Sequence, residues 1–353
     1  MKFVDLELEN REAAKLVHDS YKQIEKSGKY LLGDYLSKFE EAFAIDQKIK
    51  SVTCVKNATD ALYMTFKLLE CDKRTVIVPS FGAYPTIVAA IQAGSKNIIA
   101  APVDERMTLD LTNIDVPKDS ILVPVHLYGN QTEMSHLEKI AENTNSIIVE
   151  DCAQSTGLEK SKKSFVAIHS FYPTKPLGCR GDGGAIISND EKFISSCKKS
   201  RFYGLNDGVI NTWGFNSRMD EWQAAFLLSK LEYYDVMNKK RQSNASLYNS
   251  AFNNTVRFTQ NCVYHQYVTL WRNRDHVRDV FESNGIPTMI HYPKMLNDMP
   301  YFKSFINNKS NKRVSDHILS LPVGPHLSNE DVEKVCDVLS RMKNEVIEFT
   351  DIS

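Results

Sequence analysis

Short apolar runs alternate with segments of helical apolar spacing through the first half of the chain. The apolar runs predict strands at residues 52–55, 75–78, 97–100, 121–125 and 147–149. The helical spacing predicts helices at residues 9–26, 36–43, 59–69, 84–93 and 134–143. This alternation predicts an α/β fold in which a largely parallel sheet carries helices on both faces.

The second half of the chain has a different pattern. Residues 217–250 are predicted as one long helix, followed by a strand at 263–270 and helices at 277–284 and 329–343. Residues 307–312 are predicted as a polar loop. We therefore expect two domains, a large one at residues 1–234 and a small C-terminal one at residues 235–353.

Polar residues follow several of the apolar runs. Asn57, Ser80, His126 and Asp151 each come after a predicted strand. Ligands of open parallel sheets bind outside the carboxyl ends of the strands, so we expect these residues to gather at one edge.

Lys175 lies in a glycine-rich run, residues 170–184, that follows a strand-like stretch. An amine there and an acid, Asp151, at the end of an earlier strand suggest a cofactor with an aldehyde and a basic ring nitrogen. Pyridoxal 5'-phosphate has both. The alternative is an ordinary surface lysine in a turn, since the chain has 43 Lys and Arg residues. The run matches neither the dinucleotide fingerprint nor the P-loop.

Composition excludes several classes of protein. At 353 residues, with a net charge of −1, the chain gives no electrostatic reason to expect nucleic acid or a membrane as partner. Its N-terminus lacks the apolar region of a signal peptide, and its seven cysteines form no Cys-x-x-Cys pair. We therefore expect a cytoplasmic protein with reduced thiols, Cys152 and Cys179 acting as small buried residues. The sequence shows no cluster with metal-ligand spacing, so no metal is predicted.

Several separated motifs occur in an order that resembles the DegT/DnrJ/EryC1/StrS family of nucleotide-sugar aminotransferases. They occupy residues 57–62, 150–154, 170–175, 214–225, 291–293, 319–322 and 325–327, within a resemblance from about residue 30 to residue 338. The resemblance implies an aspartate-aminotransferase-like fold (pyridoxal-phosphate fold type I). Its large domain would contain a mostly parallel seven-stranded sheet, beside a smaller α+β C-terminal domain.

The resemblance also implies roles for individual residues. Lys175 would form the Schiff base with pyridoxal phosphate and then move protons during catalysis. Asp151 would hold the pyridine nitrogen protonated, the alternative for an Asp after a strand being a helix N-cap. The other implied cofactor contacts are Gln154 at the phenolic oxygen and Ala58, Thr59, Ser170 and Asn216 at the phosphate. Asn216 would come from the neighbouring subunit of a homodimer with shared active sites.

One position departs from the family pattern. Ala83 stands where relatives often carry an aromatic residue that stacks on the cofactor ring. Tyr84 is the candidate to replace it, the alternative being a tyrosine of the helix core.

The implied activity is transamination of a keto nucleotide-linked deoxysugar with L-glutamate as amino donor. Arg180, His291, Tyr292 and Lys294 are the candidates for binding the sugar nucleotide, with structural salt bridges as the alternative. The glycine-rich run and residues 201–204 favour a 3-keto over a 4-keto substrate. Two other functions stay open, a catalytically silent regulatory or scaffolding homologue and a dehydratase. Lys175, Asp151 and Gln154 argue against the first, and dehydratases typically carry histidine in place of the lysine.

Overall fold

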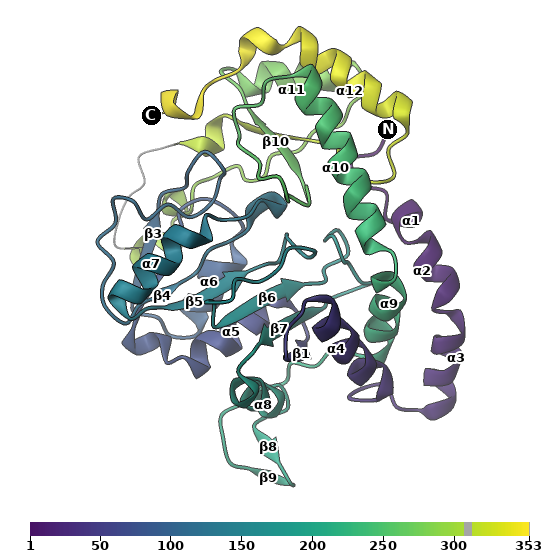
Figure 1. The fold of residues 1–353 in the computed structure, drawn as a ribbon, viewed down its shortest axis with the longest axis vertical. Helices are drawn as coiled ribbons and strands as arrows, with labels where there is room; N and C mark the ends of the chain where they lie inside the picture. The colour runs from purple at the N-terminus through teal and green to yellow at the C-terminus, as the bar shows by residue number, and fades with distance from the viewer. Residues whose placement is uncertain (307–312, 353) are drawn as a thin grey trace.

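The computed structural model describes residues 1–306 and 313–352. The predicted polar loop at 307–312 lies outside the described residues. A seven-stranded sheet lies at the centre of the larger part of the molecule (Figure 1). Its strands are β1 (Ser51–Val55), β2 (Thr75–Pro79), β3 (Asn97–Ala101), β4 (Ile121–Leu122), β5 (Ile147–Asp151), β6 (Val166–Ser170) and β7 (Gly184–Ser188).

The strand order is β1-β7-β6-β5-β4-β2-β3. Strands β3, β2, β4, β5 and β6 pair in parallel, whereas β7 runs antiparallel to both β6 and β1. The mostly parallel seven-stranded sheet is thus confirmed. Because β1 and β6 are both antiparallel to β7, β1 points the same way as the parallel strands. The carboxyl ends of β1, β2, β4, β5 and β6 therefore share one edge.

Helices cover both faces of the sheet, as predicted. Val76 and Val78 of β2 belong to one apolar cluster with α5 (Ala58–Leu68), α6 (Pro85–Gln92) and α8 (Glu191–Ser200), whereas Ile77 belongs to a cluster with α7 (Met134–Thr144) on the opposite face. The same opposite face carries α4 (Asp34–Asp46) and α9 (Glu221–Leu231) against β1 and β7. Both faces of the interior strands are buried, which explains the continuous apolar runs in the sequence.

The C-terminal part lies at one end of the sheet layer, at the top of Figure 1. It contains α10 (Tyr234–Ala251), β10 (Tyr267–Leu270), α11 (Arg274–Ser283), β11 (Ile318–Leu321) and α12 (Asn329–Arg341), with β10 and β11 antiparallel. A two-stranded hairpin, β8 (Leu205–Asn206) and β9 (Val209–Ile210), projects from the opposite end. The domain boundary between residues 234 and 235 stays a prediction, although Tyr234 does begin α10.

Seven short 3-10 helices connect these elements in the described ranges. They are η1 (Cys71–Lys73), η2 (Leu127–Gly129), η3 (Leu296–Asp298), η4 (Phe302–Ser304), η5 (Val314–Asp316), η6 (Lys343–Glu345) and η7 (Phe349–Asp351).

Both long helices predicted from the sequence are interrupted. Residues 9–26 form α1 (Leu6–Glu9), α2 (Arg11–Leu16) and α3 (His18–Ser27), which run down one side of the molecule (Figure 1). Residues 217–250 divide into α9 and α10 at Tyr233, whose φ of −140° is not helical. The Tyr233 hydroxyl accepts a hydrogen bond from the Ala13 backbone N–H at 2.7 Å. Tertiary contacts thus override a helical pattern in the sequence.

Two predicted strands are shorter in the structure. The run at 263–270 pairs as a strand only at β10, and the run at 121–125 only at β4. Val125 keeps a single bridge to Asp151. Within the described residues no helix combines the length and apolarity needed to cross a bilayer.

Candidate active site

A cavity of about 380 Å³ opens at the carboxyl-end edge of the sheet. Segments at the carboxyl ends of β1, β2, β4, β5 and β6 contribute to its lining, which includes Asn57, Tyr84, Asp151, Ser170, Lys175 and Tyr292. We call it the lysine cavity. Asn57 and Asp151 meet there as predicted. The other two expected residues are buried beside it: the hydroxyl of Ser80 has no partner among the described residues, and His126 pairs with Glu150.

Lys175 is held in a closed loop between β6 and β7. The backbone N–H of Lys175 donates to the Tyr172 carbonyl at 2.8 Å, and that of Cys179 donates to the Phe171 carbonyl at 2.8 Å. A Cβ on Gly178 would lie 2.2 Å from the Pro173 carbonyl oxygen, so only glycine lets the loop close this tightly.

The Lys175 amine is shifted toward its neutral form. Burial lowers the pKa of Lys175 to about 8, although the nearby Asp151 carboxylate opposes the shift. Near pH 8 about half of such amines are unprotonated, and the unprotonated amine is the form that attacks a carbonyl.

A second lysine, buried in α9, is hydrogen-bonded to this loop. Lys230 of α9 donates to the Gly178 carbonyl at 3.1 Å and to Asn10 Oδ1 at 2.8 Å. Burial also lowers the pKa of Lys230 to about 8. Lys230 could not be predicted as a buried residue, because it lies in a helical segment where a lysine is typical of a solvated face.

Asp151 is buried at the end of β5 and already accepts two hydrogen bonds. Thr86 Oγ1 donates to Asp151 Oδ2 at 2.7 Å, and the Ala153 backbone N–H donates to Oδ1 at 3.1 Å. Thr86 belongs to α6 and was not predicted. The two bonds fix the plane of the carboxylate.

Gln154 is buried and linked to two aromatic residues. Its Oε1 accepts from the Tyr128 backbone N–H at 2.6 Å, and its Nε2 donates to the Tyr292 hydroxyl at 3.0 Å. Nε2 has a second hydrogen, so these bonds leave Gln154 one donor for a ligand.

The N-terminus of α5 faces the same cavity, with Asn57, Ala58, Thr59 and Ser170 among the lining residues. Asn57 Oδ1 caps the helix by accepting from the Asp60 N–H at 2.8 Å. A Cβ on Gly184 would lie 2.6 Å from the Ala58 nitrogen, so glycine lets β7 approach the helix start. Backbone N–H groups at a helix start attract anions, and a phosphate would fit this corner.

Aromatic side chains form another wall. The rings of Tyr84 and Tyr292 lie 5.6 Å apart between centroids, with an angle of 58° between their planes. Ala83 also lines the cavity, so Tyr84 and Tyr292 supply the aromatic surface near this position.

The remaining predicted residues lie elsewhere. Arg180 is exposed, stacks over the Phe226 ring at 4.8 Å and lines a separate cavity beside α1 and α2. His291 lines a second cavity next to the first. Lys294 and Asn216 are both exposed, and Asn216 Oδ1 accepts from Arg218 Nε at 2.9 Å.

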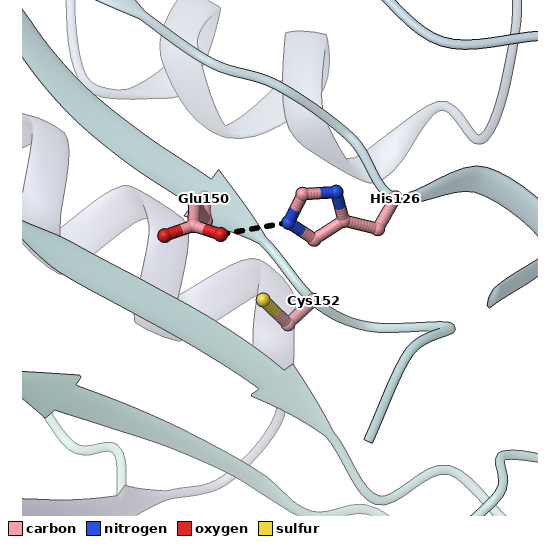
Figure 2. A group of neighbouring side chains, drawn as sticks. All are labelled: His126, Glu150 and Cys152. Carbon is pink, nitrogen blue, oxygen red and sulfur yellow. Dashed lines mark hydrogen bonds and ion pairs between the residues drawn. The ribbon is translucent and has the colours of Figure 1, made fainter. Parts of the chain in front are cut away.

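The fold also assembles a cluster that the sequence spacing did not reveal. His126, Glu150 and Cys152 place one ligand-type atom each within 4.8 Å of one another, and all three are buried. Figure 2 shows the ring of His126 facing Glu150, with their contact dashed, and the sulfur of Cys152 beside it.

The hydrogen bonds of this cluster indicate that His126 and Glu150 form a structural pair rather than a metal site. The Thr132 N–H donates to His126 Nδ1 at 3.2 Å, so the proton lies on Nε2, which donates to Glu150 Oε2 at 2.8 Å. Burial raises the pKa of the Cys152 thiol well above its usual value, so the sulfur is a neutral thiol. The pair joins the segment that follows β4 to β5, one residue before Asp151.

The lysine cavity fits pyridoxal phosphate. It joins an amine of lowered pKa, a buried carboxylate, an aromatic wall and the amide-rich start of a helix. These groups match, in order, the aldehyde, the ring nitrogen, the ring face and the phosphate of that cofactor.

Comparison with known proteins gives the same result. The chain matches the DegT/DnrJ/EryC1/StrS aminotransferase family over residues 12–340. The dTDP-3-amino-3,4,6-trideoxy-alpha-D-glucose transaminase of Streptomyces venezuelae is 30% identical over 96% of this chain and 94% of its own length. The UDP-2-acetamido-2-deoxy-3-oxo-D-glucuronate aminotransferase of Pseudomonas aeruginosa is 29% identical over 96% of this chain and 99% of its own.

A solved structure is similar throughout. The crystal structure of Streptomyces venezuelae DesV in complex with a ketimine intermediate superposes with a TM-score of 0.89 at 29% identity. It covers 98% of this chain and 99% of its own. The fold type expected from the sequence is therefore confirmed.

Proposed function

The chain belongs to the DegT/DnrJ/EryC1/StrS aminotransferase family, and we propose that it transfers an amino group from L-glutamate to C3 of a keto-deoxysugar carried on a nucleotide. It is an enzyme dependent on pyridoxal phosphate. One observation carries the proposal: Lys175, with a pKa of about 8, faces the same cavity as the buried carboxylate of Asp151.

Bound pyridoxal phosphate supplies a carbonyl carbon that can hold an amino group and a ring that accepts electrons. The side chains of this chain supply the rest. Asp151, held in one plane by Thr86 and the Ala153 N–H, would keep a proton on the ring nitrogen. The Lys175 amine would move a proton between the donor's α-carbon and the cofactor's carbonyl carbon, as a general acid–base group already in position.

The names of the relatives support amination at C3. The relatives from Streptomyces venezuelae and Pseudomonas aeruginosa are named for a 3-amino product and a 3-oxo substrate, on dTDP and UDP respectively. A 4-keto substrate is the alternative. Arg201, one of the residues that favoured C3, is buried against Glu40 and the Cys54 carbonyl, so its side chain serves the fold rather than the sugar.

Tyr292 is the predicted substrate residue best situated for this role, since it lines the lysine cavity and bonds to Gln154. With a net charge of −1, the chain has no overall charge that would attract an anionic substrate. Recognition of the pyrophosphate must therefore be local, and its binding energy would hold the keto carbon at the reacting centre.

We further propose a homodimer with shared active sites. Asn216 is exposed, and the nearby hairpin exposes Val209 and Ile210 by 60% and 65%. Exposed apolar side chains on a projecting hairpin favour contact with another protein surface. A second copy would bury them and bring its Asn216 toward the phosphate corner of the first.

The test is amino transfer from L-glutamate to a panel of 3-keto and 4-keto deoxysugars on dTDP, UDP and GDP, followed by mass spectrometry of the products. We expect amination of a 3-keto sugar nucleotide and a far lower rate with the free keto sugar. Equal rates for free and nucleotide-linked sugars would contradict the proposal, and amination of 4-keto substrates alone would favour the alternative.

A further inference from the structure

A second cavity, of about 200 Å³, shares a wall with the lysine cavity. Thr174 and His291 line the second cavity, whereas their chain neighbours Lys175 and Tyr292 line the first. Two separate peptide segments thus present one residue to each side. We call the second space the distal cavity.

The distal cavity contains a buried ion pair. The guanidinium of Arg241, on α10, lies 3.0 Å from Glu9 Oε2, and their side chains are 4% and 6% exposed. Arg241 also donates to Asn238 Oδ1 at 3.2 Å. A guanidinium has five N–H groups, and these two contacts use only part of that capacity.

Positive charge exceeds negative charge around Glu9. Lys230 is buried nearby. The positive charges of Arg241 and Lys230 both lower the pKa of the Glu9 carboxyl. His326 Nδ1 lies 3.1 Å from Glu9 Oε1, and that bond raises the pKa of His326 against the effect of burial. One carboxylate therefore faces two or three cationic groups. A buried excess of positive charge favours an additional anion.

Glu9 has a partner on each of its two oxygens. If an incoming carboxylate took its place on Arg241, Glu9 would keep its contact with His326. The two imidazoles in the cavity add hydrogen-bonding capacity without charge, because burial, reinforced by the charge of Lys175, lowers the pKa values of His265 and His291.

We propose that Arg241 binds the distal carboxylate of the amino donor in this cavity, replacing Glu9 as its partner. The inference rests on the proposed function, since it assumes L-glutamate as donor. The donor's α-carbon must react beside Lys175, and two methylene groups separate that carbon from the distal carboxylate. The charge of Lys175 acts on His265 and His291, which line the distal cavity, so this cavity lies near the reacting amine, on the side where the distal carboxylate could extend. Arg241 would then determine selectivity for glutamate over uncharged amino acids.

The experiment follows the absorbance of the bound cofactor when the holoenzyme is mixed with L-glutamate or with L-glutamine, its neutral isostere. No sugar is needed in this half-reaction. Arg241→Gln should lower the second-order rate constant for L-glutamate roughly 10- to 100-fold and leave that for L-glutamine within about twofold. In Arg241→Lys the rate constant for L-glutamate should fall less, because the positive charge is kept. Glu9→Gln removes the competing carboxylate and should raise the rate constant for L-glutamate.

Lys239→Gln is the matched control, because it removes an exposed cation from the same helix and should change neither rate constant. If Arg241→Gln were to misfold, the opposite effect expected of Glu9→Gln keeps the proposal testable. Equal losses for both donors, or slower reaction of Glu9→Gln with L-glutamate, would overturn the assignment of Arg241 alone. No absorbance change with L-glutamate in the unaltered holoenzyme would overturn the proposed donor as well.

Discussion

The hydroxyl of Thr86 lies 2.7 Å from Asp151 Oδ2, joining the start of α6 to the end of β5 at the edge of the lysine cavity. The Ala153 N–H bonds the other carboxylate oxygen. A carboxylate that must meet a ring nitrogen in one orientation needs such support, since a rotated carboxylate would direct its lone pairs elsewhere.

Thr86→Val should therefore reduce amino transfer about 10-fold, because it removes the donor and leaves the shape of the side chain unchanged. Thr86→Ser should retain most activity. The measurement is kcat for the complete reaction together with the affinity for pyridoxal phosphate. Thr65→Val is a suitable control, because the buried Thr65 hydroxyl has no hydrogen-bond partner in the described part of the chain. Full activity in Thr86→Val would show that the bond does not position Asp151.

The lowered pKa of Lys175 predicts how cofactor capture depends on pH. A pKa of about 8 leaves roughly a quarter of the amine neutral at pH 7.5, against about one part in a thousand for an ordinary lysine. The rate at which apoenzyme captures pyridoxal phosphate should rise with pH to a plateau, with a midpoint near 8. Stopped-flow absorbance measures it, and a rate still rising steeply above pH 9.5 would be inconsistent with the lowered pKa.

A buried carboxylate anchors the first helix that packs on the sheet. Glu221 accepts from the N–H groups of Gly33 and Leu36 through Oε1 and of Tyr35 through Oε2, at 2.9, 3.1 and 2.7 Å. These N–H groups lie at the start of α4, where a negative charge is stabilising.

Glu221→Gln should destabilise the protein by about 2 kcal/mol, since an amide N–H₂ would then face a backbone donor. Thermal unfolding of the holoenzyme measures the loss. Glu232→Gln, at the exposed opposite end of α9, should leave the midpoint unchanged. Equal midpoints for Glu221→Gln and the unaltered protein would rule out this anchoring role.

Subunit mixing tests the shared active site. Lys175→Ala and Asn216→Ala should each be inactive or severely impaired, one through the loss of the amine and the other through the loss of a phosphate contact from the partner. A mixed dimer contains one site with both residues intact, so mixing should restore up to about half of the activity per mixed dimer. Absence of recovery after mass spectrometry has confirmed subunit exchange would argue that each chain uses its own Asn216.

The sheet and the edge of it where ligands bind could both be predicted from the sequence. Each buried parallel strand appears as a short apolar run, and Asp151 and Asn57 follow such runs directly, so their meeting at one edge is a consequence of topology. The family resemblance then distinguished Lys175 from the other lysines as the expected cofactor-binding residue.

Contacts between distant segments could not be predicted in this way. Thr86 and Asp151 are 65 positions apart, and Glu150 and His126 are 24 apart, so their pairing depends on strand order rather than on spacing. Lys230 and Arg241 lie in helical segments where charge usually means solvent exposure, yet both are buried. The break at Tyr233 likewise depends on its bond to Ala13, 220 residues away.

The central claim is that Lys175 is the residue that carries the cofactor. Borohydride reduction of the holoenzyme, followed by peptide mass spectrometry, tests it most directly, because reduction fixes the cofactor to the amine that holds it. We expect the modification on Lys175 and none on Lys230, a fully buried lysine whose pKa is also about 8. Modification of Lys230 or another lysine instead, or bound cofactor with no modification, would contradict the account.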